Sequence, residues 1–351
     1  MSELINNRAF CGKIRNCLLA TACAATLLGA AGVAARAASD EQPGIWLELG
    51  GQFDRSSATQ EDWSPAFTVP ADPLAGSFAN IQRLPKSGYD ADAALSFRPE
   101  HSDWVFSAAI RYGKANRHAD GQAHQTYETR YHHRIYPYEN NYNAATRSKE
   151  THAILDFMAG KDVGLGVIGT GIRIAQLHSR SQTQTDSLFY LTQFGHADND
   201  VHSDASRSFR GISPRLSWDA SAPLAGRLET GRVGFDWGVN AAMLFGRQSA
   251  TATQSGTAHQ QYYKKFPTYA IVRYTQTVNT VHARRKSVIV PDLGGFAGLS
   301  YRFPNAKFSI GYRADMFFNA IDGGIAEAKK ENRGFHGAFV SFSVGVSPSD
   351  F

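Results

Sequence analysis

The sequence predicts an all-β protein, a transmembrane antiparallel up-and-down β-barrel of about ten strands with long extracellular loops. Three observations support this fold: strict alternation of apolar and polar residues, alternating short and long gaps between the alternating segments, and no apolar run in residues 38–351 long enough for a membrane helix. Apart from a helix, a closed barrel is the structure that satisfies every backbone polar group inside a bilayer.

The clearest alternation lies in residues 307–319, where every second side chain, beginning with Phe308 and Ile310, is apolar and most of those between are polar or small. A period of two is the signature of a strand with two different faces. The preceding stretch, 293–303, alternates in the same way, and only residues 304–306 separate the two. The pair is therefore predicted to form a hairpin.

Ten segments are predicted as strands by this criterion: 45–53, 88–98, 103–113, 150–160, 164–177, 207–218, 232–246, 290–303, 307–319 and 335–346. Short gaps (99–102, 161–163, 304–306) alternate with long ones (54–87, 114–149, 178–206, 247–289), and the gaps 219–231 and 320–334 are intermediate. Outer-membrane barrels of Gram-negative bacteria have this rhythm, with short periplasmic turns and long outside loops, and an even number of strands.

The alternation also assigns faces. The lipid-facing residues are predicted to be Trp104, Phe106, Ala108, Ile110 and Tyr112 in one strand, and Val233, Phe235, Trp237, Val239, Ala241, Met243 and Phe245 in another. Segment 150–160 is ambiguous, because Ile154 and Met158 share a face with His152 and Asp156. Residues 269–274 are predicted to be the arm of a protruding loop hairpin, with a further strand as the alternative.

The first 37 residues are predicted to be a signal peptide, followed by the barrel in residues 38–351. Arg8, Lys13 and Arg15 precede an apolar run, and Ala35-Arg36-Ala37 is a small-x-small cleavage site. An uncleaved membrane anchor and a lipoprotein modified at Cys23 are the alternatives. This signal, together with the barrel, predicts location in the cell outer membrane.

Composition narrows the choice of function. All three cysteines lie within the first 37 residues, so the predicted barrel has no disulfide, thiolate nucleophile or cysteine metal site. The formal net charge of +5 falls when the four cations of the signal segment are removed, and nothing in the sequence indicates a nucleic-acid partner. No catalytic residue, cofactor or metal site is expected.

Four segments, in this order, resemble the Legionella-type major outer-membrane protein family of pore-forming barrels: His152–Gly166, Gly211–Leu216, Ala242–Arg247 and Gly311–Gly324. The resemblance implies an outer-membrane pore or surface protein and supplies no catalytic residues. The chain ends in Phe351, as many barrels do, but residues 347–350 break the alternation, so the last strand is expected to stop near Val346.

Charged residues on the non-apolar faces are predicted to line the lumen: Glu48, Asp90, Asp92, Arg111, Asp156, Arg173, Arg215, Asp236, Asp292, Arg302, Arg313 and Asp315. Asp90 is expected to lie about opposite Arg111. Such a lining could select solutes. It could equally be a salt-bridge network that fills a narrow barrel, since eight strands leave an interior just filled by side chains while aqueous porins have roughly 16–18 strands.

Two further constellations leave alternatives open. Asp90, Asp92, His152 and Asp292 near the outer mouth could act as general bases in an outer-membrane hydrolase, but no catalytic motif accompanies them. The predicted loops 114–149 and 247–289 combine tyrosines with arginines and lysines. These side chains could contact proteins or glycans, or bind the phosphates of lipopolysaccharide.

The sequence therefore predicts a small passive channel or a structural surface protein with a charged lumen, and not an enzyme. The alternative is an adhesin or receptor that acts through its long loops. Expected partners are outer-membrane lipid and lipopolysaccharide, the barrel-assembly machinery, and small solutes or ions if the lumen is open.

Overall fold

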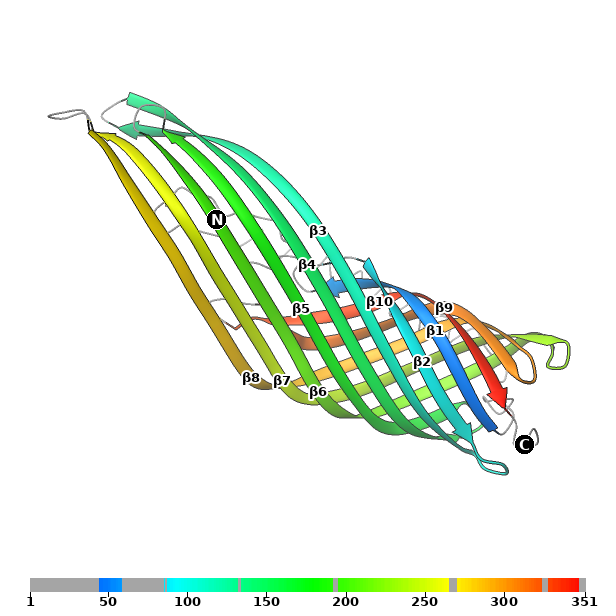
Figure 1. Cartoon of the computed structure of the whole chain (residues 1–351). Coiled ribbons are helices and arrows are strands. Elements are labelled where there is room, and N and C mark those ends of the chain that lie inside the picture. Colours follow the sequence, from blue (N-terminus) through cyan, green and yellow to red (C-terminus); the bar gives the residue numbers. More distant parts are fainter. Residues whose placement is uncertain are drawn as a thin grey trace, which may run out of the picture.

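Ten antiparallel strands close into one barrel in the computed structural model, which describes residues 44–58, 85, 87–131, 134–191, 195–264, 270–323 and 328–346 (Figure 1). Each strand pairs with its neighbours in sequence, and β1 pairs with β10 to close the ring. The strands are β1 (Gly44–Ala58), β2 (Ser87–Arg98), β3 (Trp104–Tyr131), β4 (Arg134–Asp162), β5 (Val167–Leu191), β6 (Gly195–Arg227), β7 (Gly231–Lys264), β8 (Ala270–Arg302), β9 (Ala306–Asp322) and β10 (Lys330–Val346).

All ten predicted strands are confirmed, with both described ends of the chain at the short-turn end of the barrel (Figure 1). The predicted signal peptide, residues 1–37, lies outside the described residues. So do the cleavage site and the break in alternation at 347–350.

The prediction that 114–149, 178–206 and 247–289 are long loops between strands is wrong. Wherever the structure describes them, these residues continue β3 to β8 as regular paired strands. Residues 270–274, in the predicted arm of a protruding hairpin, belong to β8 and pair with β7. The intermediate gap 219–231 is likewise mostly strand, since β6 runs to Arg227. Small side chains alternate with larger polar ones in these stretches, which suits a sheet although neither face is strongly apolar.

The long strands leave the barrel as a six-stranded extension, which we define as the part of β3–β8 beyond the last partners on β2 and β9. The pairing of β2 with β3 ends at Gly88 and Ala115, and that of β8 with β9 begins at Asp292 and Phe317. Figure 1 shows the extension rising away from the closed ring. The 33 residues of β6 span about 110 Å, whereas a bilayer needs only about 9–11 residues per strand.

The strands are tilted, as closure requires. A row of directly opposed partners that starts at Ile289 on β8 passes through all the other strands and returns to β8 at Tyr301, twelve residues further along. In barrels, such a stagger goes with strands inclined by about 35–45° to the axis. Residues far apart along neighbouring strands therefore come to similar heights.

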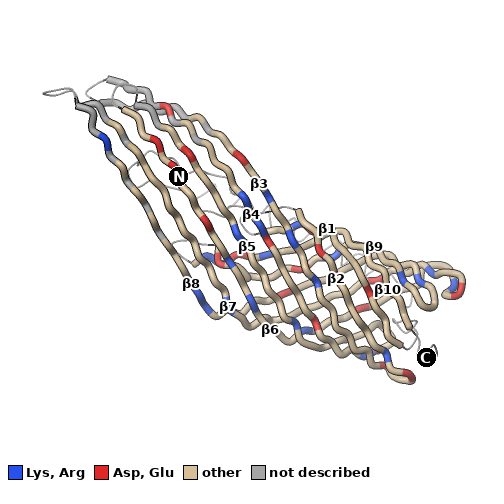
Figure 2. Tube along the Cα trace, in the orientation of Figure 1, with Lys and Arg blue, Asp and Glu red and all other residues tan. Residues whose placement is uncertain are grey.

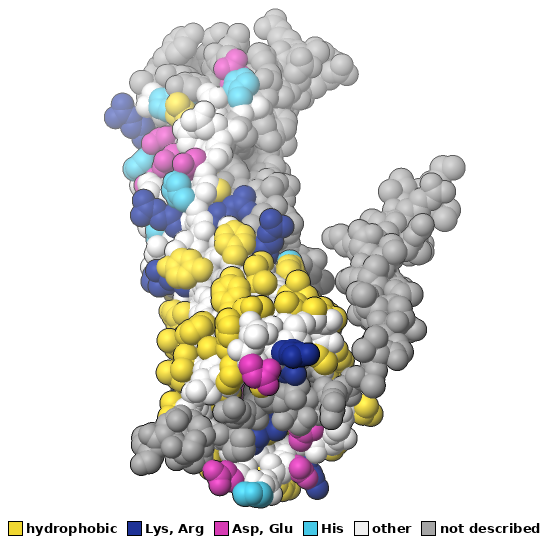
Figure 3. Space-filling model, turned by 90° about the vertical axis from the view of Figure 1, so that its right-hand side faces the viewer, with side chains coloured by type: hydrophobic (Ala, Val, Ile, Leu, Met, Phe, Trp, Pro, Cys, Tyr) yellow, Lys and Arg dark blue, Asp and Glu magenta, His cyan; other side chains and the backbone are white. Residues whose placement is uncertain are grey.

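Apolar side chains form a belt around the outside of the closed part, visible as the yellow band in Figure 3. Large apolar residues on every strand are exposed there, including Leu49, Leu95, Ile110, Phe157, Ile172, Leu216, Val239, Leu293, Ile310 and Val340. The outward faces predicted for segments 103–113 and 232–246 are confirmed, because Ile110 and Val239 are 53% and 55% exposed while Arg111 and Asp236 are buried. Among the described residues, none forms a helix of the length and hydropathy that a membrane span requires.

We expect lipid-facing and interior positions to respond differently to charge. Val239→Arg places a cation near the middle of the belt and should destabilise the barrel by about 2–4 kcal/mol, because a charge at the bilayer midplane loses its hydration. Asn240→Arg, one residue further along and on the inner face, should cost far less. Reversible urea unfolding in phospholipid vesicles would measure both, and equal losses would show that the faces are wrongly assigned.

Candidate functional site

The interior of the closed barrel holds all twelve of the charged residues that the alternation assigned to the lumen. Eight are buried: Asp90, Arg111, Asp156, Arg173, Asp236, Asp292, Arg302 and Asp315. The other four are half-buried: Glu48, Asp92, Arg215 and Arg313. Figure 2 shows basic and acidic residues interspersed along the strands of the closed part, so the interior can neutralise itself by pairing.

Arg173 on β5 contacts three carboxylates, those of Asp156, Asp292 and Asp315, and we call this set of ion pairs the central network. Its Nε and Nη2 atoms donate to the two carboxylate oxygens of Asp156 at 2.8 and 2.9 Å, a bidentate pair. Its Nη1 atom donates to Asp292 on β8 and lies 3.9 Å from Asp315 on β9. Since β5 and β8 are separated by two strands, these contacts cross the lumen.

Arg111 on β3 extends the network. Its Nη2 atom lies 2.7 Å from Asp315 Oδ2, and its Nε atom lies 3.9 Å from Asp90 Oδ2. The register differs from the prediction, because Arg111 is opposite Asp92, and Asp90 is opposite Gly113. Arg111 therefore contacts Asp90 diagonally, and its shortest ion pair is the one with Asp315, across the lumen on β9.

Asp90 also pairs with His152, whose Nε2 lies 3.1 Å from Asp90 Oδ2. The two side chains are 0% and 2% exposed, and the Phe335 ring lies 4.0 Å from the imidazole, centroid to centroid. A general base must reach the proton that it removes. This acid–histidine pair is sealed from solvent, which favours a structural role for it over water activation.

A further acid, Asp54 on β1, joins this pair. One ligand atom each of Asp54, Asp90 and His152 lies within 4.8 Å of the other two, a grouping that sequence reasoning missed because the residues come from three strands. Position 113, next to Asp90 and His152, leaves room for glycine alone, since a Cβ there would lie 2.1 Å from Asp90 Oδ1. Oxygen and imidazole ligands suit a divalent cation, but the Arg111 guanidinium beside Asp90 opposes a second positive charge.

An apolar layer adjoins the central network on the extracellular side. Its members come from β4 to β10 and are almost wholly buried: Ile154, Ala175, Leu177, Phe209, Leu244, Val290, Phe317, Ala320, Ile321 and Phe335. Phe317 and Phe335 pack edge to face with centroids 6.1 Å apart. Ile154 thus shares the inner face with His152 and Asp156, which explains why segment 150–160 showed no simple alternation.

A second buried charge cluster lies beyond the apolar layer, and sequence reasoning missed it. Arg333 Nε is 2.9 Å from Glu150 Oε1, and Arg333 Nη1 is 3.7 Å from Glu331 Oε2. Burial lowers the pKa of Arg207 to about 10 despite nearby Glu331. Burial likewise raises the pKa of Glu331, against the attraction of Arg333. Arg284 and Asp322 pair at 3.2 Å in the same region.

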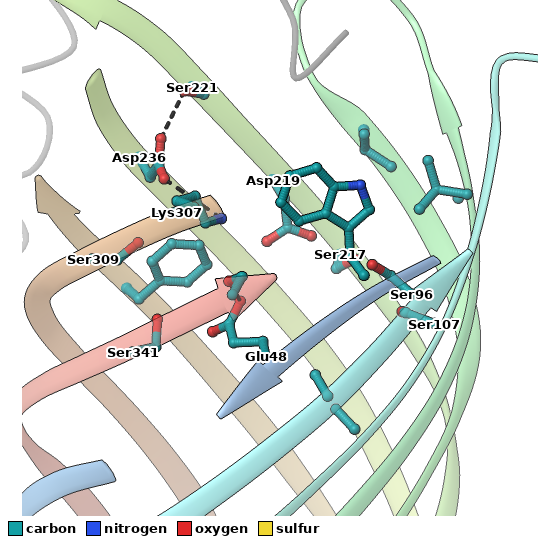
Figure 4. Close-up of a pocket in the computed structure, with 18 of the residues that line it drawn as sticks. Glu48, Ser96, Ser107, Ser217, Asp219, Ser221, Asp236, Lys307, Ser309 and Ser341 are labelled. Carbon is teal, nitrogen blue, oxygen red and sulfur yellow. Dashed lines mark hydrogen bonds and ion pairs between the residues drawn. The ribbon is translucent and has the colours of Figure 1, made fainter. Parts of the chain in front are cut away.

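On the periplasmic side of the apolar layer, the described residues line two cavities. The larger, about 370 Å³, reaches the strand ends and is rich in serines (Figure 4). At one side of it, Asp236 Oδ1 accepts hydrogen bonds from Ser221 and Arg302 at 2.6 Å each, and Lys307 Nζ lies 3.9 Å from Asp236 Oδ2. The smaller cavity, about 190 Å³, is lined by Arg111, Arg173 and other network residues.

The tyrosines predicted to make loop contacts in 114–149 and 247–289 have side chains outside the described residues. Their backbones belong to β3, β4, β7 and β8 wherever they are described. The contacts predicted for them stay predictions.

No protein-family model matches this chain, and no curated protein matches it. Similar solved structures include the translocator domain of autotransporter NalP from Neisseria meningitidis, at 13% identity over 93% of this chain and 98% of that one, with a TM-score of 0.25. Another is the Ralstonia pickettii toluene transporter TbuX, at 7% identity over 86% and 90%, with a TM-score of 0.24. The transport unit of autotransporter AIDA-I from Escherichia coli gives 5% over 86% and 90%, with a TM-score of 0.19.

Similarity this low says nothing about family or activity, and the resemblance to the Legionella-type proteins stays a prediction. The class of protein follows from the molecule itself. A closed ring of antiparallel strands leaves no unpaired edge in the lipid, and an outward apolar belt surrounds it. The chain is a ten-stranded β-barrel of the outer membrane.

Proposed function

We propose that this protein is a structural surface protein, in which a closed barrel anchors the six-stranded extension outside the cell. The observation that carries the proposal is that charged and apolar side chains from opposite walls meet across the lumen. A passive channel, the other function that the sequence predicts, would need a continuous aqueous path.

The contacts across the lumen support a sealed interior. Arg173 joins β5 to β8 and β9 across the lumen. Phe335 on β10 contacts His152 on β4 across the lumen and also packs on Phe317 of the neighbouring strand β9. Arg173 and Phe335 are each 2% exposed. Ten strands also stand close to the barrel size at which side chains fill the interior.

The two cavities supply the observation that favours the channel. They lie one beyond the other, and the charged residues Glu48, Arg215 and Arg313 line both. They end, however, at Ile154 and the central network, so they support a blind vestibule better than a pore.

Single-channel recording on the purified protein in planar bilayers tests the proposal. We expect no discrete conductance steps, with folding confirmed by faster migration of the unheated protein on gels. Arg313→Ala is recorded beside wild type, because Arg313 lines both cavities and pairs with Asp92 at 3.5 Å. Reproducible steps whose ion preference moves towards cations in Arg313→Ala would overturn the proposal and leave a small channel.

A further inference from the structure

Basic side chains gather on the outer face of β3–β8 just above the apolar belt. Figure 3 shows Lys and Arg bordering the extracellular side of the yellow band, and Figure 2 shows such residues recurring on these strands. The alternation of the strands turns seven of them outward, and we call this set the basic belt: Lys114, Arg147, Lys149, Arg180, Arg210, Arg247 and Arg285.

Two pairs within the basic belt bring like charges face to face. Lys149 on β4 is directly opposite Arg180 on β5, and Arg210 on β6 is directly opposite Arg247 on β7. All four are exposed. Directly opposed residues have Cβ atoms about 4.5–5.5 Å apart, and like charges in such positions are destabilising. An anion held between each pair would remove the repulsion.

The protein itself offers little neutralisation. Arg180 Nη2 lies 2.5 Å from Asp204 Oδ2, and Arg210 Nη2 donates to Gln176 Oε1 at 3.1 Å. Burial alone would raise the pKa of Asp204, but hydrogen bonds from Arg180 and Gln182 outweigh it and hold that pKa below its ordinary value. One ionised carboxylate thus faces the seven cations, and no other described carboxylate forms an ion pair with them.

The position of the belt identifies the anion. Arg210 and Arg247 each lie two residues, about 7 Å of strand, beyond the apolar residues Ile212 and Phe245. That is the level at which lipid headgroups meet water. Further out, a hollow of about 480 Å³ is lined by Arg147, Lys149, Arg180 and other polar residues, which gives room for a phosphorylated sugar.

We propose that the basic belt binds the phosphate groups of lipopolysaccharide in the outer leaflet, at the Arg210–Arg247 pair and in the hollow beside Lys149 and Arg180. Guanidinium groups form bidentate, charge-assisted hydrogen bonds with phosphate. The proposal rests on the outer-membrane location and on the extension facing outward. It does not depend on whether the lumen is sealed, so the conductance experiment and the following one can fail separately.

The test compares two double variants with a matched control. Arg210→Gln with Arg247→Gln, and Lys149→Gln with Arg180→Gln, each remove one like-charge pair. The control, Lys161→Gln with Arg227→Gln, removes two exposed cations near the periplasmic turns. Thermal unfolding is followed in detergent micelles, first without lipopolysaccharide and then with purified lipopolysaccharide or its dephosphorylated form.

Without lipopolysaccharide, removing the Arg210–Arg247 pair should raise the unfolding temperature, because a repulsion is lost. With lipopolysaccharide the order should reverse, and the affinity of each pair variant should be about tenfold or more weaker than wild type, the equivalent of one lost charge–phosphate contact. The control should behave as wild type in both conditions.

Three results would overturn the proposal. They are equal stabilisation by the dephosphorylated form, equal lipopolysaccharide affinity of wild type and both pair variants, and a loss of affinity in the periplasmic control as large as in the pair variants.

Discussion

Replacing Arg173 by methionine should destabilise the folded barrel by about 3–5 kcal/mol, the usual loss when one partner of a buried ion pair is removed. Methionine is unbranched but shorter than arginine and uncharged, so the variant leaves Asp156, Asp292 and Asp315 without the cation that joins them, in a site that is 2% exposed at Arg173. The free energy of unfolding would be measured in urea with vesicle-bound protein.

The matched control is Arg180→Met, which removes an arginine–aspartate pair from the outer surface of the same strand. Its side chain is 53% exposed, so the loss should stay within about 1 kcal/mol. Adding Asp292→Asn to Arg173→Met should recover part of the lost stability, since it removes one of the stranded charges. If Arg173→Met lowered the free energy of unfolding no more than Arg180→Met, the central network would not be what stabilises the barrel.

Phe335→Ala should also destabilise the barrel by about 3–5 kcal/mol, because the ring fills the apolar layer and its removal leaves a cavity between Phe317 and His152. Phe335→Leu is the control, since it retains most of the volume and should cost less than about 1.5 kcal/mol. Near-equal small losses in the two variants would mean that the layer is loosely packed and does not seal the lumen.

The barrel could be predicted from sequence wherever one face of a strand meets lipid. There the alternation is apolar against polar, as at Phe308 and Ser309, and the short turns mark where strands reverse. The extension lacked this signal. In β5, buried Ser179 and Ser181 alternate with larger outward residues such as His178 and Arg180, so the period of two appears as a difference in size and not in hydropathy.

The sequence predicts which charged residues face the interior, but it does not predict which of them form ion pairs with one another. Alternation alone turns Asp90, Arg111 and Asp315 inward. Which of them meet depends on the stagger of the closed ring, which no single strand encodes, and so Arg111 reaches a carboxylate six strands later along the chain. Buried Glu150 and Arg333 were missed because they lie at or just outside the predicted ends of their strands.

Closure of the ring has a consequence for how the protein is made. β7 and β8 form a local hairpin, whereas the seam between β1 and β10 joins residues about 300 positions apart. Loop-closure entropy makes such a seam late to form. Until the seam forms, Arg173, Asp292 and their ion-pair partners can remain hydrated. These charged residues alternate along the sequence with the apolar residues that later form the belt. We expect these charges to keep the newly exported chain dispersed in water until it reaches the membrane, where joining the first strand to the last dehydrates them together.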